Sequence, residues 1–303
     1  SRNFANKVWN ASRFIMMNLE KAEVPSKMPK DKLTLADKWI LSKVNTLATE
    51  VTDNMDRYEL GIAVQKVYDF IWEEFCDWYI EMVKPRLYSE TDETKGAALW
   101  TLKTVLGNAL KLLHPFMPYI TEEIWQVLTN EESMIMLESY PVYTEEHAYA
   151  EAAQFEKVID AIRAIRNCRT SMNVPPSKKA SVYIETQDTE LFAAAAVFFE
   201  KLASASSVEV GTSFDLQDAA TAVTDSARIF IPMAELVDRE KELARLQKEQ
   251  QKAQKDIDFL QKKLNNPGFL AKAPEQLVAA ERAKLAKATE KMEKILQSIA
   301  GLQ

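Results

Sequence analysis

Five cationic side chains within seventeen residues form the densest group that could contact an anion. Arg163, Arg166 and Arg169 repeat every three residues along a predicted helix, and Lys178 and Lys179 follow it. Because such side chains commonly contact phosphate oxygens, this group is a candidate phosphate-binding patch. The alternative is that the same cations pair with acidic helices of the protein itself, and the sequence leaves both interpretations open.

A second candidate group lies on the first predicted helix. Asn10, Arg13 and Phe14 are spaced i, i+3 and i+4, so they share one face and bring an amide, a guanidinium and an aromatic ring together. Glu81, near the end of an aromatic helix, could accept a hydrogen bond from an amino group. In the alternative interpretation Phe14 belongs to the core, and Arg13 only covers the core with the aliphatic part of its side chain. Glu81 is then a solvated carboxylate.

No arrangement of residues typical of catalysis occurs in the sequence. It contains no glycine-rich phosphate loop and no paired His, Cys and Asp set, and it has only two histidines and two cysteines. The cysteines are 92 positions apart, which suits a reducing cytoplasm better than a metal or disulfide site. No apolar stretch approaches the roughly 20 residues of a membrane span, and no secretory leader opens the chain. We therefore expect a cytoplasmic protein with no catalytic residue and no metal site.

The net charge of −7 conceals two parts of opposite sign. Residues 235–303 contain 14 Lys and Arg against 11 Asp and Glu, whereas the rest of the chain contains 24 against 34. An acidic body repels nucleic acid, so any such binding must use local basic surfaces.

Hydrophobic periodicity predicts a mainly α-helical fold in three domains. Residues 1–149 should form a bundle of about five antiparallel helices, because apolar residues recur three and four positions apart. The third of these helices is expected to end before Pro85. The predicted helices span roughly 2–20, 34–55, 60–82, 99–113 and 118–128.

Residues 150–234 are predicted to form a small α/β connecting subdomain. An amphipathic helix at 151–172 precedes short alternating segments that are typical of strands. The expected strands are 180–185, 207–210 and 227–231, arranged around a helix at 189–204.

The last domain, residues 235–303, is predicted to be an antiparallel coiled coil of two helices. Two apolar ladders with alternating three- and four-residue spacing are separated by a turn sequence at 265–268. The ladders fit each other, so that Ile257 faces Leu285 and Leu246 faces Ile295. At ~1.5 Å per residue, such a hairpin would project roughly 45 Å.

The outward face of this hairpin carries a second ladder, which is basic. Its members are Lys241, Arg245, Lys248, Lys252, Lys255, Phe259 and Lys262. Beside the seam, Asp256 is expected to face Lys284 and Glu249 to face Lys291, which leaves Lys287 free. Phe269 and Lys272 lie at the predicted tip. In the alternative interpretation the lysines are only a solvated face and the tip residues only cap the hairpin.

Several sequence strings are long enough to compare with known families. Those in the bundle are RNFANKVWNASRF at 2–14, LADKWILS at 35–42, YDFIWEEFCDWYIE at 68–81 and LHPFMPYITEEIW at 113–125. They resemble the anticodon-binding bundle of class I aminoacyl-tRNA synthetases for large aliphatic amino acids. IRAIR at 162–166 and NVPPSKK at 173–179 continue the resemblance. ARIFIP at 227–232, followed by a coiled hairpin, is similar to the bacterial valyl-tRNA synthetase family.

The resemblance implies a C-terminal fragment with an anticodon-binding domain and a coiled-coil arm that supports the tRNA corner. The family's ATP-site strings, one like His-Ile-Gly-His and one Lys-Met-Ser-Lys-Ser, are missing from the sequence. The fragment is therefore expected to bind valine tRNA but to be inactive alone, with ATP and magnesium used only by the full-length enzyme and no cofactor here. We expect a monomer that binds neither DNA nor membrane.

The resemblance also implies that the candidate residues contact tRNA. Asn10, Arg13, Phe14 and Glu81 would hold unstacked anticodon bases, because such bases are captured by stacking and by hydrogen bonds to their edges. The cations of 163–179 and of the arm, with Phe259 and Phe269, would contact the rest of the tRNA. Two alternatives remain: an anticodon-binding fragment of an isoleucine- or leucine-type synthetase, and a coiled-coil scaffold for protein interactions.

Overall fold

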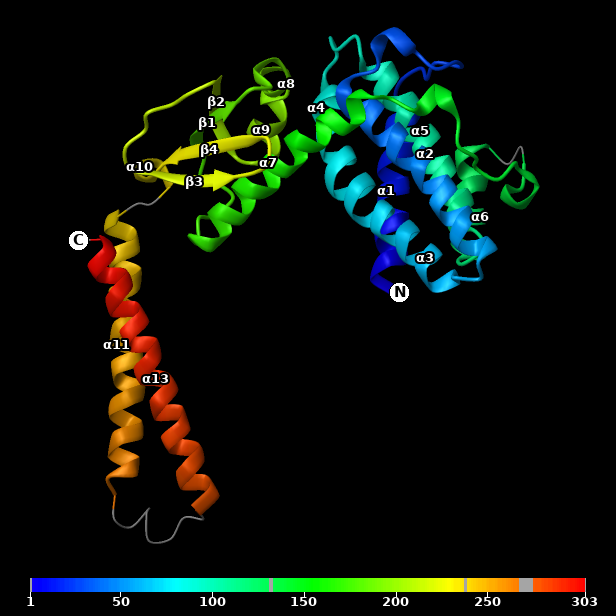
Figure 1. Cartoon of the computed structure of the whole chain (residues 1–303). Helices are drawn as coiled ribbons and strands as arrows, with labels where there is room; N and C mark the ends of the chain where they lie inside the picture. Colours follow the sequence, from blue (N-terminus) through cyan, green and yellow to red (C-terminus); the bar gives the residue numbers. More distant parts are fainter. Residues whose placement is uncertain (1, 131–132, 237–238, 267–274, 303) are drawn as a thin grey trace.

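The computed structural model describes residues 2–130, 133–236, 239–266 and 275–302. A helical bundle, a small α/β unit and a two-helix arm follow one another along the chain. The arm projects from the α/β unit, on the side away from the bundle (Figure 1). The mainly helical fold predicted from periodicity is confirmed. The domain boundaries stay a prediction, because one continuous hydrophobic core joins the bundle to the α/β unit.

Five helical segments form the bundle within the described residues, as periodicity predicts. They are α1 (Arg2–Leu19), α2 (Leu35–Asp56), the continuous run of α3 (Leu60–Asp69), η2 (Phe70–Ile80) and α4 (Glu81–Tyr88), then α5 (Lys95–Leu113) and α6 (Pro118–Leu128). Thr34 and Asp37 form a capping box at the start of α2, and Pro118 opens α6, where a missing N–H costs nothing. The connecting segments contain short turns η1 (Lys30–Lys32), η3 (Ile135–Leu137) and η4 (Glu145–His147).

The third segment differs from the prediction in two ways. Its middle part, η2, is a π-helix, and the helix continues through Pro85 to Tyr88 instead of ending before the proline. Leu87 is buried and Arg86 pairs with Asp37 of α2, so tertiary contacts outweigh the hydrogen bond that Pro85 cannot donate.

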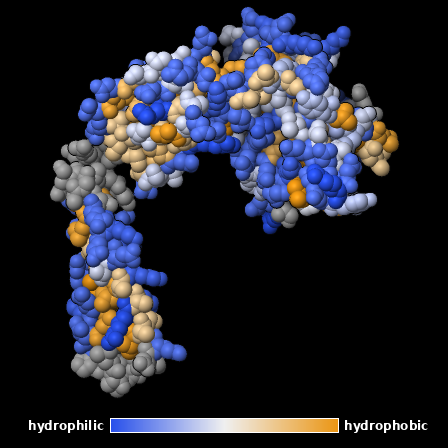
Figure 2. All heavy atoms as spheres, in the orientation of Figure 1, coloured by the Kyte–Doolittle hydropathy of each residue, from blue (hydrophilic) through white to orange (hydrophobic). Residues whose placement is uncertain are grey.

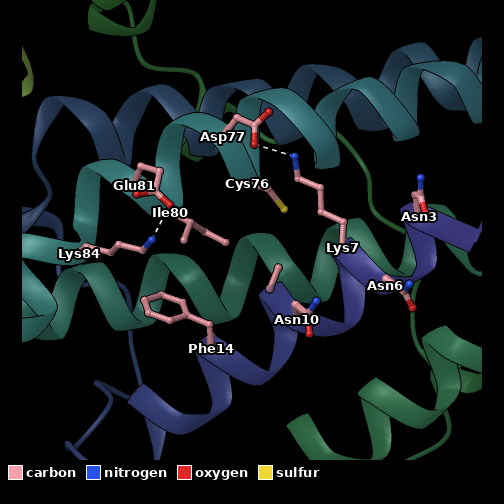
Figure 3. Close-up of a pocket in the computed structure, with 11 residues that line it drawn as sticks. Asn3, Asn6, Lys7, Asn10, Phe14, Cys76, Asp77, Ile80, Glu81 and Lys84 are labelled. Carbon is pink, nitrogen blue, oxygen red and sulfur yellow. Dashed lines mark hydrogen bonds and ion pairs between the residues drawn. The ribbon is translucent and has the colours of Figure 1, made fainter. Parts of the chain in front are cut away.

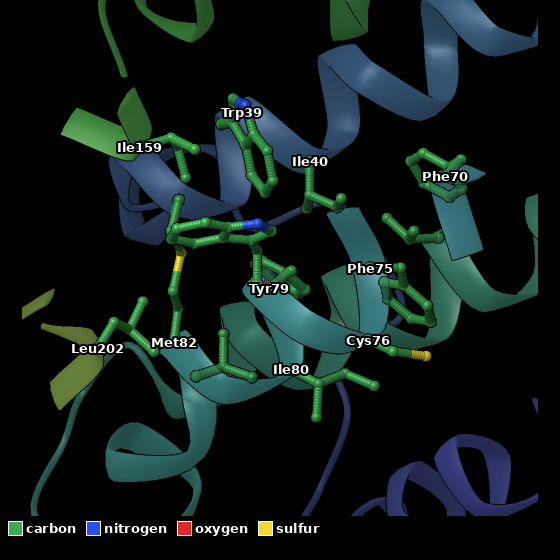
Figure 4. Close-up of a cluster of buried hydrophobic side chains, with 14 of the residues drawn as sticks. Trp39, Ile40, Phe70, Phe75, Cys76, Tyr79, Ile80, Met82, Ile159 and Leu202 are labelled. Atoms are coloured by element: carbon green, nitrogen blue, oxygen red, sulfur yellow. The ribbon is translucent and has the colours of Figure 1, made fainter. Parts of the chain in front are cut away.

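The bundle core continues into the α/β unit. Trp39 of α2 and Tyr79 of η2 lie at its centre, and Ile159 of α7 (Glu151–Ser171) and Leu202 of α9 (Ala196–Leu202) belong to the same cluster (Figure 4). Both aromatic side chains are almost fully buried. Because α7 contributes to both units, it fixes the position of the sheet relative to the bundle.

The α/β unit contains a four-stranded sheet of order β2-β1-β4-β3. Its strands are β1 (Ala180–Thr186), β2 (Ala205–Gly211), β3 (Ala219–Val223) and β4 (Ala227–Pro232), and β1 pairs in parallel with β2 and antiparallel with β4. Three of these strands match the prediction. β3 was missed because its small residues do not alternate in hydrophobicity, and the predicted helix at 189–204 is divided at Ala195 into α8 (Thr189–Ala194) and α9.

The arm consists of α11 (Arg239–Leu264) and α13 (Glu275–Leu302), which pack antiparallel below α10 (Met233–Leu236) (Figure 1). The predicted seam is confirmed: its buried members are Leu246, Ala253, Ile257, Met292 and Ile295. One predicted charge pair is wrong, because Lys284 lies 3.0 Å from Glu281 of its own helix rather than pairing with Asp256. Glu281 is buried in the seam and also lies 3.3 Å from Lys263 of α11.

The buried Glu281 carboxylate should make the arm sensitive to acid. Hydrogen bonds from Lys284 and Lys263 lower the pKa of Glu281. Because the pKa is lower in the folded state, this stabilisation is present above the ordinary value of about 4.3 and is lost as the pH falls through the folded-state pKa. Hydrogen exchange of α13 amides, corrected for intrinsic rates, should therefore accelerate at low pH.

Glu281→Gln should remove much of that acceleration, whereas Glu293→Gln, at an exposed position of α13, should retain it. Equal acceleration in both variants would contradict a role for Glu281.

Candidate functional site

A pocket between α1 and η2 brings together three residues predicted to act in binding. It has a volume of about 530 Å³, and Asn10, Phe14 and Glu81 line it (Figure 3). α1 forms one wall, and η2 with the start of α4 forms the other. Arg13 does not line the pocket, since its side chain is exposed elsewhere on α1.

Lys84, which the sequence analysis missed, links the ring and the carboxylate at one end of the pocket. Its Nζ lies 2.5 Å from Glu81 Oε1 and 5.6 Å from the centre of the Phe14 ring. Phe14 is half-buried: it packs against the core and also faces the pocket, and its role in binding stays a prediction. This end therefore offers an aromatic surface, a cation and an acceptor together.

The α1 wall carries a row of amide side chains. Asn3, Asn6 and Asn10 line the pocket and are exposed, and none of them bonds another side chain within the described residues. Only Asn10 was predicted. The signal for the other two was present, because three- and four-residue spacing continues from Asn3 to Phe14 on one face.

The opposite end of the pocket is closed by internal contacts. Lys7 Nζ lies 2.6 Å from Asp77 Oδ1 and 3.9 Å from the centre of the Trp72 ring. Cys76 also lines the pocket, and burial raises the pKa of its thiol to about 12, so it stays protonated and is a poor nucleophile. The pocket is therefore suited to binding by stacking and hydrogen bonding rather than to covalent chemistry.

The three predicted arginines of α7 all make contacts within the molecule, although Arg163 and Arg166 remain exposed and only Arg169 is buried. The Arg166 guanidinium lies 4.8 Å from the centre of the Trp78 ring, and its Nε donates to the carbonyl oxygen of Leu202 over 2.7 Å. Burial lowers the pKa of Arg166. Arg163 lies 5.4 Å from the same ring and 3.3 Å from Asp160. These arginines cover Trp78 at the junction of bundle and α/β unit.

Arg169 is buried and holds the loop that follows α7. Its Nη2 donates to the carbonyl oxygens of Pro175 and Lys178. Burial also lowers the pKa of Arg169. The Lys178 side chain is half-buried, and that of Lys179 is exposed and forms no ion pair with another described residue.

The basic ladder of the arm lies on the outward face of α11, as predicted. Its described lysines, Lys248, Lys252, Lys255 and Lys262, are exposed and form no ion pair with other described residues. Phe259 is 65% exposed among them, which is unusual for an aromatic side chain. Hydrophilic side chains border an apolar strip along the arm (Figure 2).

The other predicted arm residues divide into two groups. Lys287 is exposed on α13 without an ion pair within the described part of the chain. The side chains of Lys241 and Arg245 and the predicted tip residues Phe269 and Lys272 lie outside the described residues.

The described residues contain neither a cluster of metal ligands nor a helix suited to span a membrane. Across residues 2–130, 133–236, 239–266 and 275–302, no three His, Cys, Asp or Glu side chains gather as metal ligands would. In the same residues no helix combines the length and the apolar character needed to cross a membrane.

Two parts of the chain match known protein families. Residues 37–184 match the anticodon-binding domain of tRNA ligase, and residues 238–303 match the valyl tRNA synthetase tRNA binding arm. The first region contains the η2 side of the pocket, and the second contains the basic ladder.

Similar proteins extend the match to the remaining residues. The chain is 48% identical to the valine--tRNA ligase of Clostridium acetobutylicum, over 100% of this chain and 35% of that protein. It is 46% identical to that of Carboxydothermus hydrogenoformans (94% and 33%) and 41% identical to that of Bacillus subtilis (93% and 33%). The chain thus spans about a third of the length of these relatives. It belongs to the valine--tRNA ligase family and corresponds to its C-terminal anticodon-binding and tRNA-binding-arm region.

Proposed function

We propose that this chain binds valine tRNA, with the bundle holding the anticodon loop and the arm contacting the tRNA backbone. The observation that carries the proposal is the pocket in which Phe14, Asn10 and Glu81 meet. The family descriptions support RNA as the partner, and the names of the relatives support valine tRNA.

An unstacked base fits the chemistry of this pocket. The exposed part of Phe14 provides a surface for stacking, and RNA bases outside a helix are commonly captured on such rings. The amide of Asn10 can donate to and accept from a base edge, and the Glu81 carboxylate can accept from a base amino group. Lys84 holds Glu81 in place and contributes positive charge for the adjoining phosphate.

The arm would supply affinity that does not depend on sequence. Its exposed lysines have no internal partners among the described residues, so they can neutralise phosphates without breaking an existing ion pair. The remaining body is acidic, which directs the RNA backbone toward this ladder. Base recognition in the bundle and phosphate contacts on the arm are then separable.

Exchanging the anticodon of valine tRNA tests the bundle's part of the proposal. Binding of valine tRNA and of the same tRNA carrying an isoleucine anticodon would be compared by gel shift. The native chain should prefer the valine anticodon, because its third base is a cytosine whose amino group can donate to the Glu81 carboxylate, whereas the uracil at that position of the isoleucine anticodon has no amino group. Phe14→Leu keeps an apolar side chain but loses the stacking surface, and should weaken valine tRNA binding by about 1–3 kcal/mol.

Tyr119→Leu is the matched control, because Tyr119 is an aromatic residue that is 92% exposed and lies outside the pocket. Equal binding of both tRNAs by the native chain would contradict anticodon recognition. An effect of Tyr119→Leu as large as that of Phe14→Leu would contradict the assignment of this pocket.

A further inference from the structure

A second groove in the bundle lies between α5, α6 and the segment that follows α1. It has a volume of about 380 Å³, within the range of ~300–1,000 Å³ typical of ligand sites. One face of α5 provides half of the residues that line it, and these residues recur every three or four positions. These are Trp100, Lys103, Thr104, Gly107, Asn108 and Lys111. None of them lines the pocket between α1 and η2.

The groove is basic although the body around it is acidic. Its lining contains Lys103 and Lys111 and no carboxylate. Lys103 is exposed and has no ion-pair partner within the described residues. Lys111 lies 5.0 Å from the centre of the Trp125 ring and 3.5 Å from Glu138, the nearest acidic partner. A negatively charged ligand is therefore favoured here.

Three half-buried polar groups in the groove also lack partners. The Trp100 indole N–H, the Thr104 hydroxyl and the Asn108 amide form no hydrogen bond with any described residue. These three groups are therefore free to bond a ligand that enters the groove. The Trp100 ring is held edge-on against His147, with centroids 6.3 Å apart, which fixes its orientation.

We propose that this groove holds one unstacked nucleotide of single-stranded RNA. The base lies against Trp100, its edge bonds Asn108 and Thr104, and its phosphate sits at Lys103. Stacking on an aromatic ring combined with a neighbouring cation is how proteins hold single strands with little sequence preference. The inference goes beyond the proposed function, because it assigns a second RNA site on a different face of the bundle and needs no particular anticodon.

The test uses the full chain carrying Phe14→Leu, so that the first pocket contributes little. Binding of a fluorescent pentaadenylate would be measured by anisotropy. Trp100→Leu should weaken binding at least about tenfold, and Trp100→Phe should restore it to within about threefold, because stacking needs a ring. Lys103→Glu should also weaken binding and should reduce the salt dependence by the ~0.7 expected for one phosphate of a single strand.

Lys201→Glu is the matched control, since Lys201 is an exposed lysine of α9 outside both cavities and has no ion pair in the described part of the chain.

Photocrosslinking with an oligonucleotide that contains 4-thiouridine should label the α5 peptide. The proposal would be overturned if both Trp100→Leu and Lys103→Glu bound the oligonucleotide as tightly as the chain with Trp100 and Lys103 intact. It would also be overturned if an abasic strand bound equally well, or if crosslinks were confined to α1, η2 and the arm. If the native chain, with Phe14 intact, showed no preference for the valine anticodon while α5 was still labelled, only the proposed function would be contradicted.

Discussion

Replacing Asp37 with alanine should lower the free energy of unfolding by about 3–5 kcal/mol, because it breaks a buried ion pair and leaves a charge without its partner. The Asp37 carboxylate is fully buried, and Arg86 Nη1 and Nη2 donate to its two oxygens over 2.8 and 3.0 Å. The Tyr79 hydroxyl donates to the same carboxylate over 2.6 Å. Urea denaturation followed by tryptophan fluorescence would measure the change.

The same network ties three helical segments together. Asp37 belongs to α2, Tyr79 to η2 and Arg86 to α4, and Arg86 also donates to Thr94 at the start of α5. Burial raises the pKa of Tyr79 well above its usual value, so its hydroxyl stays a donor to Asp37. Loss of the carboxylate should therefore loosen the helix that forms one wall of the α1–η2 pocket.

A second variant separates the ion pair from general damage to the core. Combining Asp37→Ala with Arg86→Met removes both charges, and this double variant should be more stable than Asp37→Ala alone. Glu93→Ala, which breaks the exposed pair with Lys32, should leave the denaturation midpoint unchanged. If Asp37→Ala and Glu93→Ala had the same effect, the buried network would not be a major source of stability.

Reversing two charges on the arm, by Lys248→Glu with Lys252→Glu, should weaken tRNA binding at least about tenfold near 0.1 M salt. Both lysines are exposed on the outward face of α11 and pair with no other described residue. Because each phosphate contact contributes ~0.7–0.9 to the salt dependence, the slope should fall by about 1.4–1.8. Binding would be measured at several salt concentrations.

The loss should be equal for valine tRNA and for the tRNA with the exchanged anticodon, since phosphate contacts carry no base information. Lys291→Glu reverses an exposed charge on α13 and should have a clearly smaller effect. Unchanged binding by the α11 double variant at every salt concentration would rule out this role. If the full chain then sedimented as a dimer, the protein-interaction scaffold would become the better explanation of the arm.

Local periodicity was sufficient to predict most of the helices and the arm register. α1, α2, α6 and α7 each bury one stripe of apolar residues that repeats within the helix itself, and the more apolar α5 is buried around most of its circumference. The arm seam is equally visible, because Ile257 and Leu285 keep the coiled-coil spacing on two helices of one hairpin. β3 left no such pattern, since its residues are held by pairing with β4 rather than by an alternating apolar face.

The candidate site could be predicted only in part from the sequence, because the residues that line the pocket are distant from one another in the chain. Spacing placed Asn10 and Phe14 on one face, but the facing Glu81 and Lys84 are brought there by the path of η2 and α4. The arginines of α7 had the same outward spacing as free cations, yet Trp78 and the backbone of the following loop engage them. Neither kind of contact leaves a signal in the charge pattern of one helix.

The sequence by itself therefore determined the helices, the arm seam and the family, because these depend on residues near one another or on long matching strings. Tertiary structure decided which cations have internal partners, since the three arginines of α7 contact Trp78 or backbone carbonyl groups, whereas Lys248 and Lys252 have no ion-pair partner among the described residues. It also decided that the helix continues through Pro85, because the ion pair of Arg86 with Asp37 outweighs the local preference of proline.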